Sequence, residues 1–262
     1  MQLAYQISNE DLFTLAPVEV HLMIDVHNLR KRFKQVNAVD GVSFSARDGA
    51  ITGLLGHNGA GKSTSLRILY GLLKADSGSA DIDGIDVMTQ PQQAQEIIGV
   101  MTDAHGLYPR LTAREHIEYF AQLRKLDKST IRRRVGQLIE QLAMEEIADR
   151  RAEGYSQGEK MKVCLARSLV HDPQNIIMDE PTNGLDVMTT RSVRKILQDL
   201  KQKNKCILLS SHIMQEISAL CDEVIVISDG KVLMQGSLDE MLALAGESDL
   251  EEAFMTLTRS SK

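Results

Sequence analysis

The sequence predicts an α/β fold in which a mostly parallel sheet has helices on its faces and a helical segment inserted into it. Three observations predict this fold. Short β-rich runs alternate with helical patterns, a glycine loop joins one strand to one helix, and residues 112–170 hold helical patterns alone. Strands that alternate with helices indicate a parallel sheet, because parallel strands need crossover connections. The 262 residues suffice for one large domain, or for a domain with a subdomain.

Runs of aliphatic and β-branched residues predict the strands, and apolar residues at a helical spacing predict the helices. Strands are expected at 40–45, 51–55, 80–87, 97–101, 175–179, 205–210, 223–228 and 231–235. Helices are expected at 62–73, 113–125, 129–143, 159–170, 188–202, 213–220 and 237–245. Asp83-Gly84 and Asp229-Gly230 are turn signals typical of hairpins.

The first 22 residues differ from the rest of the chain, because they show no clean period before the strand-like run Ile24 to Val26. They are interpreted as a loosely attached extension, or as the product of a start codon assigned upstream of a native one at Met23. The expected organisation is an extension at 1–22, a main domain at 23–246 with a helical subdomain at about 104–170, and a C-terminal helical tail at 247–262.

A phosphate-binding pattern, G-x-x-x-x-G-K-[ST], follows the apolar run Ile51 to Leu55. It consists of Gly56, His57, Asn58, Gly59, Ala60, Gly61, Lys62, Ser63 and Thr64. The glycines let successive backbone N–H groups point at phosphate oxygens, and the helix that follows adds the positive end of its dipole. Lys62 supplies a point charge, and the Ser63 hydroxyl can ligate Mg²⁺. A chance match has odds on the order of one per cent, so the pattern predicts that the chain binds a nucleoside triphosphate.

Two carboxylates, Asp179 and Glu180, end the mostly apolar run that begins at Asn175. In a parallel sheet they would lie at the carboxyl edge, beside the phosphate loop. There Asp179 can hold Mg²⁺, and Glu180 can orient or deprotonate an attacking water. A surface Asp-Glu pair at a strand end is the competing interpretation, which the preceding phosphate loop disfavours.

Composition excludes several other classes of protein. The net charge of −6 argues against a protein that coats nucleic acid. Arg132-Arg133-Arg134 is interpreted as the solvated face of a helix, and Cys164, Cys206 and Cys221 as buried thiols in a reducing compartment. No window reaches roughly 18 consecutive apolar residues, and no signal peptide opens the chain. These features predict a cytosolic protein, unless a partner holds it at a membrane.

Four further segments occur in a distinctive order. They are Phe33 in a strand-like run, Tyr155-Ser156-Gln157-Gly158-Glu159 at a helix start, Pro181-Thr182-Asn183-Gly184-Leu185-Asp186 after Glu180, and Ser210-Ser211-His212 after a β-rich run. With the two nucleotide motifs, they make residues 23 to about 258 resemble the nucleotide-binding subunits of ATP-binding cassette (ABC) transporters. The resemblance implies a P-loop NTPase of the ABC type, with an antiparallel β subdomain beside the parallel sheet.

The resemblance also implies an ATPase with ATP and Mg²⁺ as cofactors. Lys62, Glu180 and His212 would be catalytic, Phe33 would stack on adenine, and Ser156 and Gly158 would bind the γ-phosphate of an ATP held by a second subunit, in a homodimer. A separate membrane permease would be driven by this dimer, which would place the chain on the cytoplasmic face of the inner membrane. No nucleic acid is expected as a partner.

The sequence departs from the family pattern at two places. The signature has Gln157 where glycine is usual and Glu159 where glutamine is usual. Asp103 stands where the family has a glutamine near Mg²⁺, and we expect it to keep a role close to the metal. The segment 98–112, the run 184–188 and the tail 249–254 are similar to ATPase subunits of bacterial sodium-ion exporters, so export of Na⁺ is the expected function.

Two alternatives belong to other classes. A soluble ABC ATPase that acts on ribosomes or nucleic acid usually has two cassettes or long coiled coils, whereas this chain has one cassette and no sustained heptads. A regulatory switch without turnover is disfavoured because Glu180 and His212 are both present.

Overall fold

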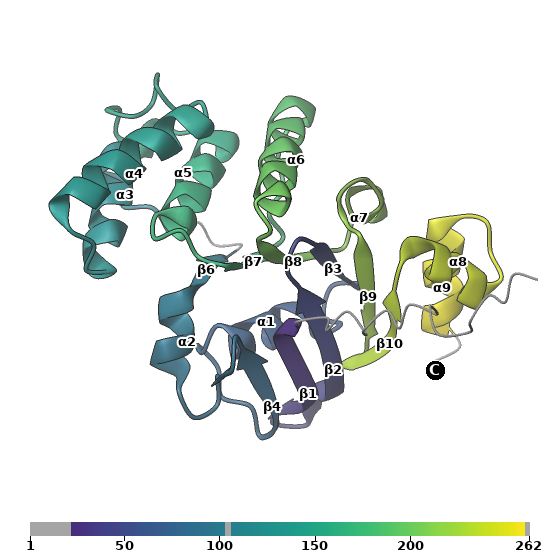
Figure 1. Cartoon of the computed structure of the whole chain (residues 1–262). Coiled ribbons are helices and arrows are strands. Elements are labelled where there is room, and N and C mark those ends of the chain that lie inside the picture. Colours follow the sequence, from purple (N-terminus) through teal and green to yellow (C-terminus); the bar gives the residue numbers. More distant parts are fainter. Residues whose placement is uncertain (1–21, 103–105, 260–262) are drawn as a thin grey trace, which may run out of the picture.

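The computed structural model describes residues 22–102 and 106–259. Within this part of the chain, ten strands form two sheets (Figure 1). The larger sheet is parallel except for its last strand, β10, which pairs antiparallel with β9. Its strands in spatial order are β10 (Lys231–Gly236), β9 (Glu223–Ser228), β3 (Ile51–Leu55), β8 (Cys206–Ser211), β7 (Asn175–Asp179) and β6 (Ile98–Met101).

The smaller sheet is antiparallel throughout. Its strands in spatial order are β2 (Val36–Arg47), β1 (Leu22–Phe33), β4 (Ser77–Ile82) and β5 (Ile85–Asp86). This sheet and helix α1 (Lys62–Leu69) lie below the parallel sheet in Figure 1. The α/β fold with a mostly parallel sheet and an antiparallel part is therefore confirmed.

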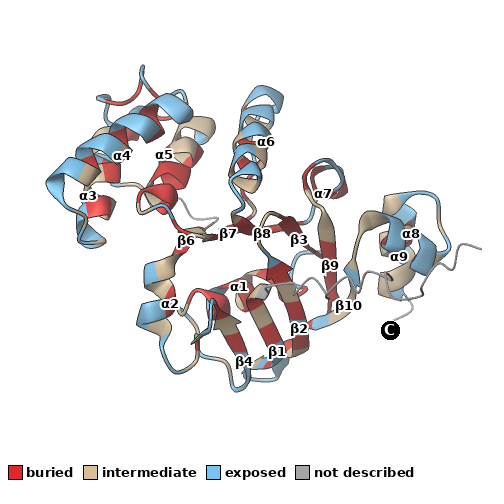
Figure 2. Cartoon of the chain, viewed as in Figure 1, coloured by how far each residue is buried: buried red, intermediate tan, exposed pale blue. Residues whose placement is uncertain are grey.

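The central strands β3, β7 and β8 are buried along their whole length, as expected for parallel strands covered on both faces. Successive side chains of a strand face opposite sides, so the sheet divides two apolar clusters. Ile176 and Ile207 belong to the cluster shared with the helices above the sheet, whereas Ile177 and Leu208 belong to the cluster shared with α1 and the antiparallel sheet. Figure 2 shows this buried layer running through the centre of the molecule.

A group of helices lies to one side of the sheets, between β6 and β7 in the chain (Figure 1). It consists of α3 (Ala113–Leu123), α4 (Lys128–Gln141), the 3₁₀ turn η1 (Ala152–Gly154) and α5 (Gln157–Leu169). Side chains cap each α-helix at its start: Thr112 caps α3, Asp127 caps α4 and Ser156 caps α5. These caps satisfy backbone N–H groups that a helix start leaves without a partner.

The remaining helices are α2 (Pro91–Ile97), α6 (Val187–Gln202), α7 (Met214–Leu220), α8 (Leu238–Ala245) and α9 (Leu250–Arg259). On α4, the apolar residues Ile131, Val135, Leu138 and Ile139 are buried, and Arg132 and Arg133 are exposed. Arg134 instead donates to the carbonyls of Val170 and Leu169, at the end of α5. The expectation of a solvated arginine face was therefore right for two of the three arginines.

Several expected boundaries were wrong. The run 80–87 is not one strand, because Asp83 and Gly84 have positive φ values of 53° and 80° and turn the chain between β4 and β5. The first expected helix ends at Leu69 rather than at residue 73, two residues before Gly71 with its φ of 69°. Cys164 and Cys206 are buried as expected, but Cys221 is only partly buried. The expected extension at 1–22 lies outside the described residues, apart from the backbone of its last residue.

Candidate functional site

The phosphate loop connects β3 to α1 through a tight turn. Gly61 has a φ of 108°, and a Cβ atom at this position would lie 2.5 Å from the Ala38 carbonyl oxygen. A Cβ at Gly56 would lie 2.4 Å from the Ile227 carbonyl oxygen. Gly61 combines a left-handed backbone with a close approach, whereas Gly56 has the close approach alone, and glycine suits both positions because it lacks a Cβ atom. The loop therefore keeps its shape because side chains are absent at these two positions.

Lys62 is the first residue of α1, and its side chain turns back over the loop. Its Nζ donates to the carbonyl of Gly56 at 2.8 Å and lies 3.4 Å from that of His57. The ammonium group is thus held above the N-terminus of α1, where backbone N–H groups and the helix dipole also favour negative charge. An anion bound in the loop would therefore be stabilised both by the Lys62 ammonium group and by the N-terminus of α1.

Asp179 ends strand β7 and is 3% exposed. Its Oδ1 accepts hydrogen bonds from Ser63 Oγ at 3.1 Å and from Ser210 Oγ at 2.6 Å. Ser210 Oγ in turn accepts from the backbone N–H of Glu180 at 3.0 Å. The parallel register places Asp179 and Ser210 opposite each other on β7 and β8, which explains how the serine reaches both acidic residues.

Glu180 follows β7 and has a left-handed backbone, with a φ of 51°. One carboxylate oxygen, Oε1, lies 3.3 Å from Lys62 Nζ. The other, Oε2, accepts a hydrogen bond from His212 Nδ1 at 2.8 Å. Lys62, which follows β3 through the phosphate loop, and His212, which follows β8, therefore meet at the carboxylate that follows β7, as expected at the carboxyl edge of a parallel sheet.

These side chains surround a cavity of about 320 Å³. It is lined by Ala38, His57, Asn58, Gly59, Gly61, Lys62, Ser63, Thr64, Glu180, Asn183 and His212. Two other expected loop residues lie behind it, since Ala60 is fully buried and Gly56 holds Lys62 through its carbonyl. The structure thus brings the three expected catalytic residues to the expected phosphate loop.

The oxygen atoms next to this cavity suit a magnesium ion. Ser63 Oγ and Asp179 Oδ1 lie 3.1 Å apart, and Asp179 also has its second carboxylate oxygen. Mg²⁺ prefers oxygen ligands and is usually bound through one or two carboxylates together with substrate phosphates. The third expected metal ligand, Asp103, lies outside the described residues.

Among the described residues that line the phosphate cavity, three expected site residues are missing: Phe33, Ser156 and Gly158. Phe33 lies at the end of β1 with 46% of its surface exposed, and Lys31 Nζ is 5.8 Å from the centre of its ring. Ser156 and Gly158 lie at the start of α5, within the helical group. The site formed by a single chain therefore lacks the signature residues.

The signature segment is held by contacts within its own chain. Ser156 Oγ accepts from the Glu159 N–H at 3.2 Å, and Glu159 Oε2 accepts from the Ser156 N–H at 2.7 Å, which is a capping box. Arg150 pairs with the other oxygen of Glu159, and its guanidinium lies 5.2 Å from the centre of the Tyr155 ring. Burial raises the pKa of the Glu159 carboxyl, but hydrogen bonds from Ser156 and Arg150 outweigh it, and the pKa lies below its ordinary value.

Gly158 packs against the start of α6. A Cβ atom on Gly158 would lie 2.8 Å from Thr189 Cγ2 and 2.9 Å from Thr189 Oγ1. Thr189 itself is fixed by Asp186, whose carboxylate caps α6 by accepting from the Thr189 backbone N–H at 2.9 Å and from its hydroxyl at 2.8 Å. The signature is therefore in direct contact with the start of α6, which Asp186 of the loop after Glu180 caps.

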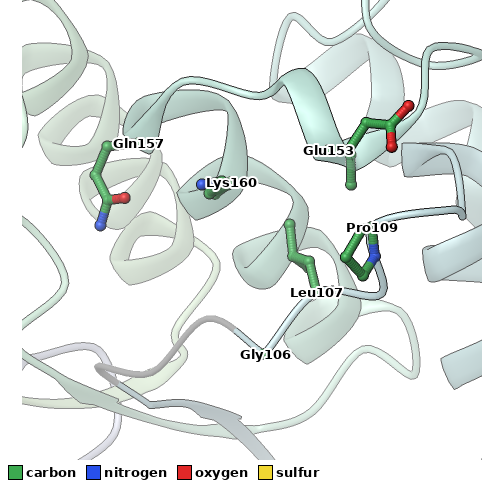
Figure 3. A pocket seen from close by; sticks show the side chains of 7 residues that line it. Gly106, Leu107, Pro109, Glu153, Gln157 and Lys160 are labelled. Carbon is green, nitrogen blue, oxygen red and sulfur yellow. The ribbon is translucent and has the colours of Figure 1, made fainter.

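A second cavity, of about 520 Å³, lies beside the signature (Figure 3). Gln157 and Lys160 come from the start of α5, Glu153 from η1, and Leu107 and Pro109 from the loop before α3. The residues that line this second cavity differ from those that line the cavity at the phosphate loop.

Sequence reasoning did not single out Ser210, Ala38 or Asn183 as site residues. Ala38 and Asn183 line the cavity, and Ser210 holds Asp179 and the Glu180 backbone. Asn183 and Ser210 lie in segments that sequence analysis did recognise, but an alanine on a strand carries no chemical signal. Ala38 is placed by the pairing of β1 and β2, which only the structure reveals.

Comparisons with known proteins agree with this geometry. The model of the family described as "ABC transporter" matches residues 39–183. The ABC transporter ATP-binding protein NatA of Bacillus subtilis is 41% identical over 89% of this chain and 97% of its own length. The Nod factor export ATP-binding protein I of Ralstonia nicotianae is 37% identical over 88% of this chain and 72% of its own length.

Solved structures show the same fold. An ATP binding subunit of an ABC transporter superimposes with a TM-score of 0.83 at 28% identity, over 90% of this chain and 99% of that one. A dimeric ATP-binding cassette in a post-hydrolysis state, bound to ADP and Pi, superimposes with a TM-score of 0.76 at 25% identity, over 82% of this chain and 99% of that one.

Among residues 22–102 and 106–259, no helix has the length and apolar character to cross a bilayer. The fold, the phosphate loop with its carboxylates and the extent of the family match all indicate the same family. The chain therefore belongs to the ABC transporter family, as one of its ATP-binding and ATP-hydrolysing subunits.

Proposed function

We propose that the chain hydrolyses Mg²⁺-ATP as one half of a homodimer and thereby drives export through a separate membrane permease. The observation that carries this proposal is the placement of Glu180. Its carboxylate lies 3.3 Å from Lys62 Nζ and accepts a hydrogen bond from His212, at the mouth of the phosphate loop. A base, a cation and an imidazole are thus grouped where the γ-phosphate of a bound ATP would lie.

The proposed chemistry follows from these positions. Phosphate oxygens would replace the Gly56 carbonyl and Glu180 as partners of Lys62, which leaves Glu180 free to accept a proton from an attacking water. His212 would donate to the γ-phosphate and hold that water in line. Mg²⁺, bound near Ser63 and Asp179, would offset negative charge on the phosphates. Phe33 would stack on adenine through its exposed ring.

A second subunit would complete the site. Ser156 is exposed and lies on the helical group rather than at its own chain's phosphate cavity. In a two-fold dimer each signature would face the ATP of the partner, because a symmetric interface repeats every contact twice. The dimeric relative bound to ADP and Pi supports this arrangement. ATP would then favour the closed dimer, since a ligand shifts an equilibrium toward the state that it binds better.

The permease would dock on the side of the molecule where the helical group meets the edge strand β6. There a cavity of about 900 Å³ is bordered by α2, α3 and β6. Two leucines on its rim, Leu72 and Leu123, are 71% and 59% exposed. Exposed apolar side chains around a groove mark interaction surfaces. Asp103 follows β6 in the sequence, and we keep the proposal that it acts close to the metal.

Export as the direction of transport is supported by the relative named for Nod factor export. Sodium as the cargo rests on the similarity of segments 98–112 and 249–254 to subunits of sodium-ion exporters. The permease, a separate chain, would select the cargo and hold this subunit at the cytoplasmic face of the membrane.

Glu180→Gln tests the hydrolytic role. We expect ATP hydrolysis to fall by at least about 100-fold, as for loss of a general base, while ATP-bound dimers accumulate in size-exclusion chromatography. Glu223→Gln is a matched control, because Glu223 does not line the phosphate cavity in the described part of the chain. Its carboxylate pairs instead with Arg47, at 2.7 Å from the guanidinium Nε. Hydrolysis at the wild-type rate in Glu180→Gln would remove this residue from the role of base.

Transport is tested with everted vesicles that contain the chain and a permease that copurifies with it. ATP-dependent Na⁺ uptake that Glu180→Gln abolishes would support sodium export. Uptake of another cargo alone would refute sodium but keep the transport proposal. Binding to ribosomes, with no permease recovered and no flux, would favour the soluble alternative.

A further inference from the structure

A buried carboxylate lies behind the catalytic pair. Glu216 is in the first turn of α7 and is 8% exposed. Its Oε2 accepts hydrogen bonds from two hydroxyl groups, Thr182 Oγ1 and Ser211 Oγ, the latter at 3.2 Å. Both donors are buried as well. A carboxylate removed from water is costly unless it is well bonded, so its place here needs a reason.

The two donors flank the residues that were assigned to hydrolysis. Thr182 comes two residues after Glu180, in the turn that the Asn183 N–H closes on the Glu180 carbonyl at 3.2 Å. Ser211 comes directly before His212, and its Oγ also accepts from the Ile213 N–H at 3.0 Å. A chain of hydrogen bonds therefore runs from the residue after His212, through Ser211 and Glu216, to the turn after Glu180.

We propose that Glu216 is a positioning residue for ATP hydrolysis, which holds the segments that carry Glu180 and His212 at the separation where these two side chains hydrogen-bond. This inference rests on the proposed function of both residues. Within the described part of the chain, Glu216 does not line the phosphate cavity, so it acts through its neighbours. A single oxygen that accepts from both segments fixes their spacing more tightly than two separate acceptors would.

The hydroxyl of Thr182 offers a matched pair of variants. Thr182→Val removes the hydroxyl but keeps the branched shape, whereas Thr182→Ser keeps the hydroxyl. We expect Thr182→Val and Glu216→Ala to lower kcat by about 10-fold or more, because a small misplacement of catalytic groups is costly to the rate. Thr182→Ser should retain most of kcat. The KM for ATP and ATP binding by fluorescence titration should stay within about twofold of wild type in all three.

A double-mutant cycle of Glu216→Ala with His212→Ala tests whether Glu216 acts through His212. If Glu216 acts through His212, then Glu216→Ala should add little to the loss caused by His212→Ala. Equal losses in the two backgrounds would overturn the inference, as would wild-type kcat in Glu216→Ala with only a lower Tm. If Glu216→Ala does not fold, the Thr182 pair still decides: equal kcat in the Val and Ser variants overturns the inference.

Glu180→Gln, measured in parallel, separates this inference from the proposed function. Loss of hydrolysis in Glu180→Gln together with normal kcat in Thr182→Val would refute the positioning role alone. Normal hydrolysis in Glu180→Gln would instead refute the proposed base, and with it the basis of the inference.

Discussion

Gly158→Ala should destabilise the protein, although alanine is the better helix former. The added Cβ would lie 2.8 and 2.9 Å from two atoms of Thr189. Overpacking of this kind costs about 1–3 kcal/mol. Replacing a helical glycine returns at most about 1 kcal/mol. We therefore expect the free energy of unfolding to fall by up to about 2 kcal/mol.

Gly136→Ala is the control for helix propensity. Gly136 lies within α4, and an added Cβ there meets nothing within 4 Å. Its substitution should raise the free energy of unfolding by up to about 1 kcal/mol. Urea denaturation of both variants measures the difference. If Gly158→Ala were as stable as Gly136→Ala, the contact with Thr189 would not constrain the signature.

Thr189→Ala removes the two clashing atoms and leaves only Cβ, 3.4 Å from the added methyl group. The double variant should therefore be more stable than the sum of the single effects, by about 1 kcal/mol. The ATPase rate then distinguishes two roles of the glycine. If stability returns but hydrolysis does not, the signature needs the bare backbone at Gly158 for phosphate. If both return, the packing against α6 accounts for the glycine.

Two further predictions concern charge. His171 donates through Nε2 to the Ile98 carbonyl at 3.0 Å, and burial lowers its pKa to about 4. Because the unfolded chain takes up this proton near pH 6.5, the free energy of unfolding should fall by about 2 kcal/mol from pH 7 to 4.5. Urea titrations measure this pH dependence, and a His171→Gln variant with the same dependence as the wild type would contradict the prediction. Arg150→Gln should weaken ATP-driven dimerisation, measured by sedimentation, because it leaves the Glu159 charge unpaired beside the signature. Adding Glu159→Gln to the same chain should restore dimerisation. If Arg150→Gln caused the same loss with Glu159 and with Gln at position 159, this charge effect would be excluded.

The phosphate loop was predictable because its requirements are local. Glycines with positive φ, a preceding apolar strand and a lysine at the helix start are all readable within about fifteen residues. The α/β class followed in the same way from alternating patterns. Helix α2 was missed because its glutamines give no apolar stripe and only Ala94 is buried. Its one local signal, Pro91 at the first turn, is too weak alone.

The network behind the site could not be predicted, since it depends on pairing between distant segments. Ser210 reaches Asp179 because β7 and β8 align in one register, a relation between residues 31 positions apart. Glu216 meets Thr182 across 34 positions. A single sequence contains serines, threonines and glutamates in many places, and nothing local marks the ones that meet. The roles of the site residues, among them Phe33 and the signature residues, stay predictions.

The left-handed backbone of Glu180 has a consequence for how this subunit can fail. Residues other than glycine, asparagine and aspartate rarely adopt that conformation, and holding one there costs on the order of 1–3 kcal/mol. Replacement of Glu180 by glycine, asparagine or aspartate would relieve this cost, so such copies would be at least as stable as the parent while lacking the glutamate proposed as the base. Such copies would escape quality control, accumulate normally and compete for the same partners, so a single damaged gene could suppress an intact one.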